Sequence, residues 1–311
     1  MKIVFLDMAT LADLPVELAK FADLGEYVEY GFTAPEQLLE RLEGAAVAIT
    51  NKVYLGEETI SALPDLRLIC ISATGKNNVD LEAAAARNIP VLNVAGYSTA
   101  SVAQWTLTAV NALAMDLIHL NEAVYDGTYA ASPHFSYWRR PFYELTGKRY
   151  GIVGLGAIGR AVAKLAVAFG AEVVYHSTSG SRREEEYPAV SLDELLTTCD
   201  VISLHCPLNA TTENLLGYAE LQRMKPSAYL VNAGRGGIVN EAALARALNE
   251  ELLAGAATDV FASEPPPPDH PYFSVRDRSR LLLTPHVAWA SVEARTELLR
   301  AIRENITSVF G

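Results

Sequence analysis

Residues Arg149–Arg160 read Arg-Tyr-Gly-Ile-Val-Gly-Leu-Gly-Ala-Ile-Gly-Arg, and this stretch decides the fold. Its first half is a short run of β-forming residues, and its second half is a Gly-x-Gly-x-x-Gly turn that opens an alanine-rich helix. Such a turn is a weak signal on its own, but between a strand and a helix it is typical of a dinucleotide-binding βαβ unit. The alternative is an ordinary turn between strand and helix that binds nothing.

Each glycine of the turn has its own expected role. Gly154 permits the tight turn, Gly156 lets the backbone approach a pyrophosphate, and Gly159 lets the helix and the strand pack closely. The helix N-terminus offers free N–H groups and the positive end of its dipole to the phosphates. We therefore expect the cofactor to contact Gly154, Gly156, Ala157, Ile158 and Gly159.

The next predicted strand ends without an acidic residue. A site selective for NAD usually carries Asp or Glu there, about 20 residues on, to hold the ribose 2′-hydroxyl. Val173–Ser179 contains none, so an acceptor for NAD and a charge that would repel the 2′-phosphate of NADP are both missing. Arg182 and Arg183 follow closely enough to pair with that phosphate. The sequence favours NADP over NAD; the alternative is that Arg182–Glu186 is a solvated helix start whose charges neutralise one another.

Short β-rich runs alternate with helical patterns on both sides of this stretch. Before it, we expect strands at Lys2–Asp7, Tyr27–Tyr30, Ala45–Thr50, Leu66–Ser72 and Val91–Val94, and helices at Pro15–Phe21, Pro35–Leu42, Glu57–Leu63 and Asp80–Arg87. From it onward, we expect strands at Arg149–Val153, Ala171–His176, Asp200–His205, Ala228–Asn232, Ala254–Asp259 and Leu281–Thr284, and helices at Ala157–Phe169, Leu192–Thr197, Ala219–Met224 and Glu241–Asn249. The alternation predicts an α/β fold of two doubly wound domains with parallel sheets covered on both faces.

A longer helical stretch, Ser101–Tyr125, separates the two alternating regions. Aromatics, prolines and paired arginines then break the pattern in Thr128–Leu145, which predicts an irregular connection. Trp138 in this connection either packs at a subunit interface, closes over a cleft or belongs to the core of the loop. A final helix is expected from Ser291 to about Val309.

Length and composition narrow the class of protein. The 311 residues predict about two domains. Lys plus Arg number 25 and Asp plus Glu 37, and the resulting net charge of −12 repels phosphate backbones and anionic membranes, so we expect neither nucleic acid nor membrane as a partner. The three cysteines lack metal-binding spacing, and no apolar run approaches about 18 residues. We expect a cytoplasmic protein with reduced thiols and no metal site.

Further motifs follow the glycine turn in a fixed order. They are His-Cys-Pro-Leu at His205–Leu208, Val-Asn-Ala-Gly-Arg-Gly at Val231–Gly236, Asp-Val-Phe at Asp259–Phe261, Glu-Pro at Glu264–Pro265 and Thr-Pro-His at Thr284–His286. In this order and at these spacings, the whole chain resembles the D-isomer-specific 2-hydroxyacid dehydrogenases. Short runs resemble the glycerate dehydrogenases, or hydroxypyruvate reductases, of that family; they are Thr50–Val53, Ala73–Gly75, Asn77–Asp80 and Ala288–Ala290.

The resemblance implies a divided chain. Residues 1–98 plus 288–311 would form a flavodoxin-like substrate domain, and residues 99–287 an inserted Rossmann domain that binds NAD(P). It also implies a homodimer, an active site in the cleft, and Arg235, Glu264 and His286 as catalytic residues. Besides the glycine turn, we expect the cofactor to contact Ser177, Thr178, Arg182, Cys206, Pro207, Thr212, Ala233, Gly234 and Asp259.

The chemistry of the three catalytic candidates fits the reduction of a 2-keto acid to a D-2-hydroxy acid. That reaction needs a hydride, a proton for the carbonyl oxygen and a fixed cation for the carboxylate. Imidazole titrates near neutrality, so His286 can donate the proton, and a carboxylate from Glu264 on its other nitrogen would favour the imidazolium. The forked, always charged Arg235 can hold the substrate carboxylate and polarise the carbonyl. His286 also follows a strand at its carboxyl end, where open α/β sheets bind ligands.

Other polar residues are assigned with their alternatives. Lys52, Thr74 and Gly75 are expected to contact the substrate with Arg235 and His286, although Lys52 could be only a charge on the rim. Separately, His205 fits a turn that lines the cofactor better than it fits catalysis. Asp259 either accepts from the nicotinamide carboxamide or is a satisfied loop carboxylate.

The expected activity is the interconversion of a small D-2-hydroxy acid and its 2-keto acid, with glycerate and hydroxypyruvate or glycolate and glyoxylate as the expected pairs. An alternative is a dinucleotide-sensing interaction protein, because transcriptional corepressors resemble this family and keep the same three residues. Such proteins usually carry extra tails, and this chain has almost nothing before Lys2 or after Val309. An L-isomer Rossmann dehydrogenase would carry its glycine turn near the N-terminus, whereas here the turn begins at Gly154.

Overall fold

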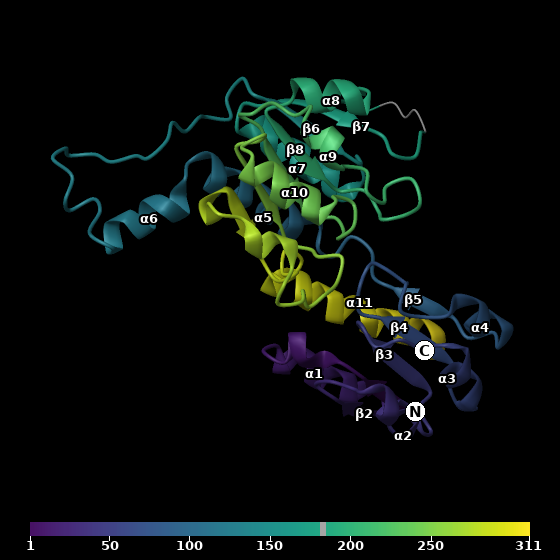
Figure 1. The fold of residues 1–311 in the computed structure, drawn as a ribbon. Helices are drawn as coiled ribbons and strands as arrows, with labels where there is room; N and C mark the ends of the chain where they lie inside the picture. Colours follow the sequence, from purple (N-terminus) through teal and green to yellow (C-terminus); the bar gives the residue numbers. More distant parts are fainter. Residues whose placement is uncertain (181–184) are drawn as a thin grey trace. The chain divides into compact units, whose positions relative to one another are not determined.

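The computed structural model describes residues 1–180 and 185–311. The chain forms two compact units, one made of Met1–Ser98 with Ala290–Gly311 and the other of Thr99–Trp289. Each unit contains one sheet in which the paired strands are parallel (Figure 1). The fold class predicted from the sequence, two doubly wound parallel-sheet α/β domains, is confirmed.

The first unit has a five-stranded sheet in the order β2-β1-β3-β4-β5, which is the flavodoxin-like order. Its strands are β1 (Lys2–Phe5), β2 (Glu26–Glu29), β3 (Val47–Thr50), β4 (Leu68–Ile71) and β5 (Val91–Asn93). Its α-helices are α1 (Pro15–Ala19), α2 (Leu38–Leu42), α3 (Glu57–Ala62), α4 (Leu81–Ala86) and α11 (Val292–Phe310), and short 3-10 turns cover Met8–Leu11, Lys20–Leu24 and Pro35–Gln37.

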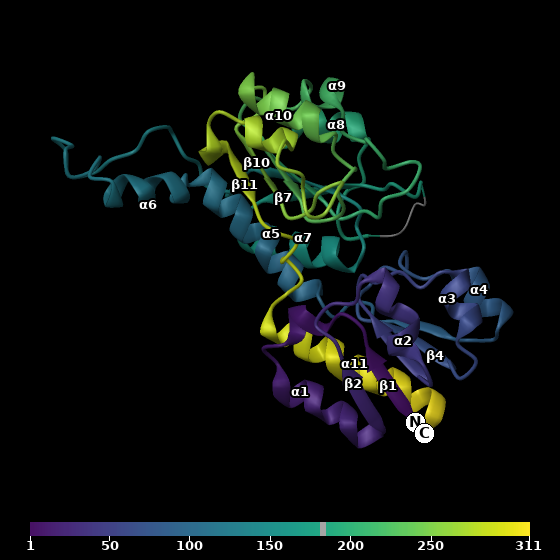
Figure 2. The same ribbon diagram turned by 60° about the horizontal axis from the view of Figure 1, so that its bottom comes forward.

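Alternation along the strands builds the core of this unit on two faces. Val4 and Leu6 point to one face, where they pack in a cluster with residues of α2, α3 and α4. The last helix, α11, contacts β4 and α1, and it runs along the sheet in Figure 2. Ser291 caps this helix by accepting a hydrogen bond from the N–H of Ala294 at 3.1 Å. The C-terminal helix thereby completes the fold of the N-terminal sheet.

The second unit has a six-stranded sheet in the order β11-β10-β9-β8-β6-β7. Its strands are β6 (Arg149–Val153), β7 (Glu172–His176), β8 (Val201–Leu204), β9 (Tyr229–Asn232), β10 (Gly255–Thr258) and β11 (Leu281–Leu283). A parallel bridge from Tyr175 to Ala189 adds a further short segment beyond β7. Because the chain leaves β6 toward β7 and later returns to β8 on the other side, the strand order reverses between β6 and β8, which is where such sheets bind ligands.

Helices cover both faces of this second sheet. The helices of this unit are α5 (Thr99–Ala114), α6 (Leu117–Tyr125), α7 (Ala157–Ala168), α8 (Leu192–Thr198), α9 (Tyr218–Leu221) and α10 (Glu241–Asn249), with 3-10 turns at Pro271–Ser274 and Arg278–Arg280. Residues of α5 and α7 form one core cluster with the sheet, and residues of α8, α9 and α10 form the other. Within the part of the chain that the structure describes, no helix combines the length and apolar character needed to cross a membrane.

The predicted long helix Ser101–Tyr125 is wrong in one respect, because it is two helices. Asp116 separates α5 from α6 with a left-handed φ of 51°, and its side chain is only 4% exposed. Arg140 donates to Asp116 Oδ1 at 2.7 Å, so an ion pair from the following connection holds this break. Beyond it, α6 extends away from the sheet of its own unit (Figure 1).

The second boundary between the units also differs from the expected one. Residues 288 and 289 belong to the second unit rather than the first. The carbonyl of Ala288 accepts a hydrogen bond from Ser101 Oγ at 2.6 Å, and the indole N–H of Trp289 donates to the carbonyl of His286 at 2.8 Å. These bonds attach Ala288 to α5 and Trp289 to the turn after β11, and both belong to the second unit.

Candidate active site

The glycine turn after β6 has the geometry that a dinucleotide phosphate needs. Gly154 has a φ of 91°, and a Cβ there would lie 2.8 Å from the backbone N of Cys206. A Cβ on Gly159 would lie 2.4 Å from the carbonyl oxygen of Gly154, so a side chain would push α7 off the turn. In contrast, a Cβ on Gly156 would meet nothing within 4 Å, which leaves space for a ligand beside the helix N-terminus.

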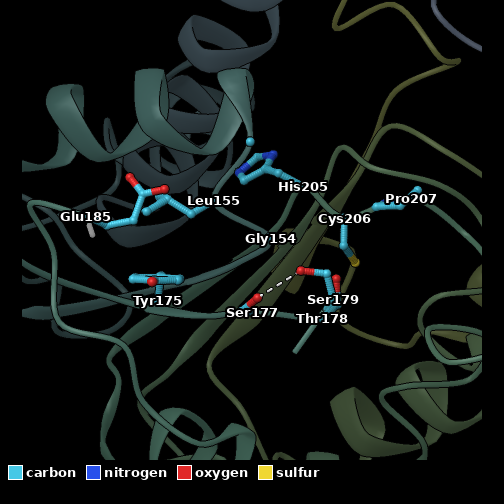
Figure 3. Close-up of a pocket in the computed structure, with 11 residues that line it drawn as sticks. Gly154, Leu155, Tyr175, Ser177, Thr178, Ser179, Glu185, His205, Cys206 and Pro207 are labelled. Atoms are coloured by element: carbon cyan, nitrogen blue, oxygen red, sulfur yellow. Dashed lines mark hydrogen bonds between the residues drawn. The ribbon is translucent and has the colours of Figure 1, made fainter. Parts of the chain in front are cut away.

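A cavity of about 200 Å³ opens beside this turn (Figure 3). It lies at the carboxyl ends of β6, β7 and β8, where the strand order reverses. The residues that line it are Gly154, Leu155, Gly156, Tyr175, Ser177, Thr178, Ser179, Glu185, His205, Cys206 and Pro207. The open glycine turn and the adjoining cavity fit the diphosphate and nucleoside of a nicotinamide cofactor.

Hydroxyl side chains stand where NAD-selective sites carry a carboxylate. Ser177 and Thr178 line the cavity as predicted positions directly after β7, and the hydroxyls of Ser177 and Ser179 are 3.3 Å apart (Figure 3). Glu185 also lines the cavity, and its Oε1 lies 2.7 Å from Nη1 of Arg160 in α7. The sequence reasoning missed Glu185, because it follows the strand end by nine residues. Arg182 and Arg183, predicted to meet a 2′-phosphate, lie outside the described residues.

The segment after β8 forms another wall of the cavity. Cys206 and Pro207, which are predicted to contact the cofactor, line this cavity, and burial raises the pKa of the Cys206 thiol to about 11. Burial also lowers the pKa of His205 to about 3, so its imidazole is neutral at physiological pH and is a poor general acid. Thr212 does not line the cavity: it is fully buried, and its hydroxyl donates to the carbonyl of Pro207 at 2.6 Å. It shapes the turn that carries Pro207.

His286 and Glu264 form a close pair at the carboxyl end of the sheet. Nδ1 of His286 lies 2.7 Å from Oε2 of Glu264, and the two side chains are 27% and 30% exposed. His286 follows β11 with a left-handed φ of 55°, a conformation that non-glycine residues rarely adopt and that is common at functional sites. Since Nδ1 is engaged, Nε2 is the nitrogen that remains to exchange a proton with a ligand.

Asp259 holds the turn that carries His286. Its Oδ1 accepts from the hydroxyl of Thr284 at 2.5 Å and from the N–H of Val287 at 2.8 Å, and its Oδ2 accepts from the N–H of Ala288 at 2.7 Å. Its backbone carbonyl also accepts from the N–H of His286 at 2.8 Å. Burial raises the pKa of this 1%-exposed carboxyl, and these hydrogen bonds oppose the rise. These hydrogen bonds favour the alternative interpretation of Asp259, a satisfied loop carboxylate; its contact with the cofactor stays a prediction.

Arg235 lies in the loop after β9, the strand next to β10. The side chain of Asn232 accepts from the N–H of Gly234 at 3.1 Å and donates to the carbonyl of Arg235 at 2.9 Å, so the backbone is held from both sides. Nη1 of Arg235 donates to the carbonyl of Gly234 at 2.8 Å, and the residue is exposed. Ala233 and Gly234, expected to contact the cofactor, belong to this same loop and do not line the cavity beside Gly154.

The residues of the first unit that are predicted to contact the substrate lie at the carboxyl ends of its strands. Lys52 follows β3, and Thr74 and Gly75 follow the adjacent parallel strand β4. Asp7, after β1, accepts from the N–H of Asn51 at 2.8 Å and from the N–H of Lys52 at 2.6 Å. The backbone of Lys52 is thus fixed while its side chain is exposed. Across residues 1–180 and 185–311, no three His, Cys, Asp or Glu side chains gather into a metal-binding group.

Comparisons with known proteins agree with this geometry. Residues 107–288 match the family described as "D-isomer specific 2-hydroxyacid dehydrogenase, NAD binding domain". The chain is 40% identical over 306 residues to a glycerate dehydrogenase of Methylorubrum extorquens, covering 98% of this chain and 95% of that protein. It is 34% identical over 311 residues to a hydroxypyruvate reductase of Blautia hydrogenotrophica, covering 98% and 96%.

A solved structure shows how the fold is used elsewhere. An acyclic imino acid reductase in complex with NADPH and D-Arg superposes with a TM-score of 0.86 at 28% identity, covering 100% of this chain and 97% of that one. These relatives are named as enzymes, so the comparisons do not support the alternative of a dinucleotide-sensing interaction protein, and the predicted family is confirmed. The chain belongs to the D-isomer-specific 2-hydroxyacid dehydrogenase family, oxidoreductases that act on CH–OH groups with a nicotinamide cofactor.

Proposed function

We propose that this protein reduces hydroxypyruvate to D-glycerate, or glyoxylate to glycolate, and catalyses the reverse oxidations. The observation that carries the proposal is the 2.7 Å pair between His286 and Glu264 at the carboxyl end of the sheet that also bears the glycine turn. The names of the two relatives, glycerate dehydrogenase and hydroxypyruvate reductase, support a three-carbon hydroxy acid. Hydroxypyruvate is therefore our first choice.

The proposed role of each residue follows from the hydrogen bonds that its atoms already make. Glu264 holds Nδ1 of His286, so the other ring nitrogen, Nε2, is the one that donates the proton to the substrate carbonyl oxygen and recovers it in the oxidation. Arg235, whose backbone is held on both sides, binds the substrate carboxylate through its forked guanidinium. The reduced nicotinamide, when bound, supplies the hydride. Lys52, Thr74 and Gly75 are proposed as further substrate contacts.

An initial-rate panel tests the substrate proposal. Hydroxypyruvate, glyoxylate, pyruvate and a branched keto acid are each offered with NADH and with NADPH, and cofactor oxidation is followed by absorbance. We expect hydroxypyruvate or glyoxylate to have the highest kcat/KM. If neither cofactor is oxidised with any of the four acids, the proposal is wrong, and the result would favour a dinucleotide-sensing interaction protein instead.

The preferred cofactor is proposed to be NADP. The support is the row of hydroxyls at Ser177, Thr178 and Ser179 in place of a carboxylate. Glu185 is the one acidic residue lining the described cavity, and its ion pair with Arg160 at 2.7 Å offsets its repulsion of a 2′-phosphate. Arg182 and Arg183 are proposed to bind that phosphate.

Replacing Arg182 and Arg183 together with serine tests the cofactor choice. We expect the KM for NADPH to rise about tenfold or more while the KM for NADH changes little, because only NADPH carries the extra phosphate. The matched control is the double variant of Arg223 and Arg246, which removes the same charge from the turn after α9 and from α10, neither of which lines the cavity. Equal rises in both Michaelis constants would show that the two arginines are only a solvated surface.

A homodimer in the cytoplasm is also part of the proposal. The arm formed by α6 and the connection after it exposes large apolar side chains, with Tyr125 87%, Phe135 95% and Trp138 60% exposed. Trp138 is therefore not loop core, and an exposed apolar arm is typical of a subunit contact. Sedimentation equilibrium tests the dimer proposal, and the expected mass is that of two chains.

The proposed location in the cytoplasm rests on the cysteines. The three buried free thiols fit a reducing compartment.

A further inference from the structure

A second carboxylate–histidine pair lies beneath the loop that carries Glu264. Glu241 is the first residue of α10, and its Oε2 is 2.9 Å from Nε2 of His270. The side chains are 14% and 3% exposed, so the pair is largely shielded from water. Nothing in the sequence patterns singled out either residue.

Two consecutive backbone N–H groups connect this pair to Glu264. The N–H of Ala262 donates to Oε1 of Glu241 at 2.8 Å, and the N–H of Phe261 donates to Oε1 of Glu264 at 3.0 Å. The other oxygen of Glu264 lies 2.7 Å from Nδ1 of His286. The carboxylates of Glu241 and Glu264 therefore bind adjacent peptide groups of one short segment. Glu264 also contacts His286, the proposed general acid.

The hydrogen bonds determine the protonation state of His270. The N–H of Tyr272 donates to Nδ1 at 3.3 Å, so Nδ1 is an acceptor and carries no proton. Nε2 must then carry the proton and donate it to Glu241. The rings of Phe261, Tyr272 and Phe273 surround this imidazole, with the Phe261 ring edge-on at 5.4 Å. His270 is thus a neutral, fixed donor that orients the carboxylate of Glu241.

The same segment also packs against the loop of Arg235. A Cβ on Gly236 would lie 2.0 Å from the carbonyl carbon of Phe261 and 2.3 Å from the N of Ala262, so only glycine allows this approach. A shift of the Phe261–Ala262 peptide would therefore disturb the adjoining peptide, whose N–H binds Glu264, and would press on the neighbour of Arg235. Both proposed catalytic loops depend on where this one peptide lies.

We propose that Glu241 and His270 are positioning residues for the reaction. His270 orients the carboxylate of Glu241, Glu241 holds the N–H of Ala262, and the adjoining N–H of Phe261 holds Glu264 against His286. Neither residue exchanges a proton with the substrate. The inference rests on the proposed roles of His286 and Glu264, and it adds what keeps their geometry in place.

The pH profile of kcat/KM for hydroxypyruvate reduction tests this. The carboxylates that face His286 among the described residues are Glu264 and Asp259. Reduction needs a proton from the His286–Glu264 pair, so kcat/KM is expected to fall at alkaline pH, and the position of this alkaline limb depends on how Glu264 contacts the ring. We expect Glu241→Gln to move this alkaline limb down by about one pH unit and to lower kcat about tenfold, with the cofactor KM little changed.

Glu241→Gln is chosen because it would place two hydrogen-bond donors opposite each other in the pair with His270. If the amide oxygen of Gln keeps the bond to Ala262, its NH₂ group faces the Nε2–H of His270, and the alternative tautomer of His270 loses the bond from Tyr272. His270→Gln, in contrast, retains an amide donor that can reach Glu241, so we expect its alkaline limb to return most of the way to that of the unmodified enzyme. A purely structural role would not give this order.

The matched control is Asn249→Ala, at the other end of α10. Asn249 donates to the carbonyl of Ser274 at 3.2 Å and accepts from the N–H of Arg276 at 2.9 Å, so it holds a later part of the same segment. We expect this variant to lower Tm and leave the alkaline limb in place. If Glu241→Gln also lowers only Tm, the positioning role is wrong. If Glu264→Gln itself fails to move the limb, the proposed function is wrong instead.

Discussion

His286→Ala should lower kcat for keto-acid reduction by about 10²–10⁴-fold, the usual contribution of a general acid. The carbonyl oxygen gains negative charge as the hydride arrives, and without the imidazolium only water remains to protonate it. The Kd of the cofactor should change little, because His286 is not among the described residues that line the cavity beside Gly154.

The loss should not come from unfolding. The left-handed backbone at φ 55° is adopted by the histidine already, so alanine adds little new strain. The backbone N–H still donates to the carbonyl of Asp259, and Glu264, which loses a partner, is 30% exposed and can be hydrated. His286→Asn is a useful second variant, because Asn tolerates a left-handed φ better than most residues.

Steady-state kinetics and fluorescence titration of the cofactor separate the two effects. We expect a large loss in kcat for both His286 variants, an unchanged Kd for NADPH, and a Tm within a few degrees of the original. Near-normal reduction of hydroxypyruvate by His286→Ala would remove this residue from the mechanism. A weakened Kd with normal kcat would place it in the cofactor site instead.

Arg235→Lys should lower kcat/KM by about 10–100-fold, although the positive charge is kept. A hydrogen bond to a charged group is worth about 1.5–3 kcal/mol, and the ammonium can replace only part of the planar fork that binds both oxygens of a carboxylate. The backbone of this loop is fixed by Asn232 and by the close contact of Gly236 with Phe261, so a shorter reach cannot be recovered by moving the loop. Arg235→Gln, which loses the charge as well, should lose more.

The split between KM and kcat identifies what the arginine does. If it holds the substrate carboxylate, KM for hydroxypyruvate rises in both variants, and if it also polarises the carbonyl, kcat falls too. Arg223→Lys is the matched control, since Arg223 pairs with Asp193 on the surface of the same unit. An unchanged KM and kcat in Arg235→Lys would rule out the proposed role.

Much of the fold was predictable because its signals are local. Strand β6, the glycine turn and α7 follow one another within 20 residues, and each is encoded by its own residues. The periodicity of the other elements predicted them in the same way, and their bounds differ mainly at the ends. The break in the long helix was missed because no local signal marks Asp116: its left-handed backbone is held by Arg140, which lies 24 residues later.

The candidate site was predictable only in part. The resemblance to the family implied His286, Glu264 and Arg235 as catalytic residues, but it could not show the hydrogen bond between the first two. Asp259 had two interpretations in the sequence, a cofactor contact or a satisfied loop carboxylate, and only the structure shows that both of its oxygens bind the turn around His286. No sequence pattern marked Glu241 and His270 as a pair, because their hydrogen bond joins the start of a helix to a loop 29 residues away.

By itself, the sequence determined the two α/β domains, the dinucleotide-binding turn and the family, because these depend on short-range patterns and on motifs in a fixed order. Only the tertiary structure decided which polar groups share hydrogen bonds. Buried donors and acceptors must find partners wherever the packed sheet brings them, and those partners are 22 residues apart for His286 and Glu264. The periodicity of a strand or helix determines the face on which a side chain lies, and tertiary packing determines which groups that side chain contacts.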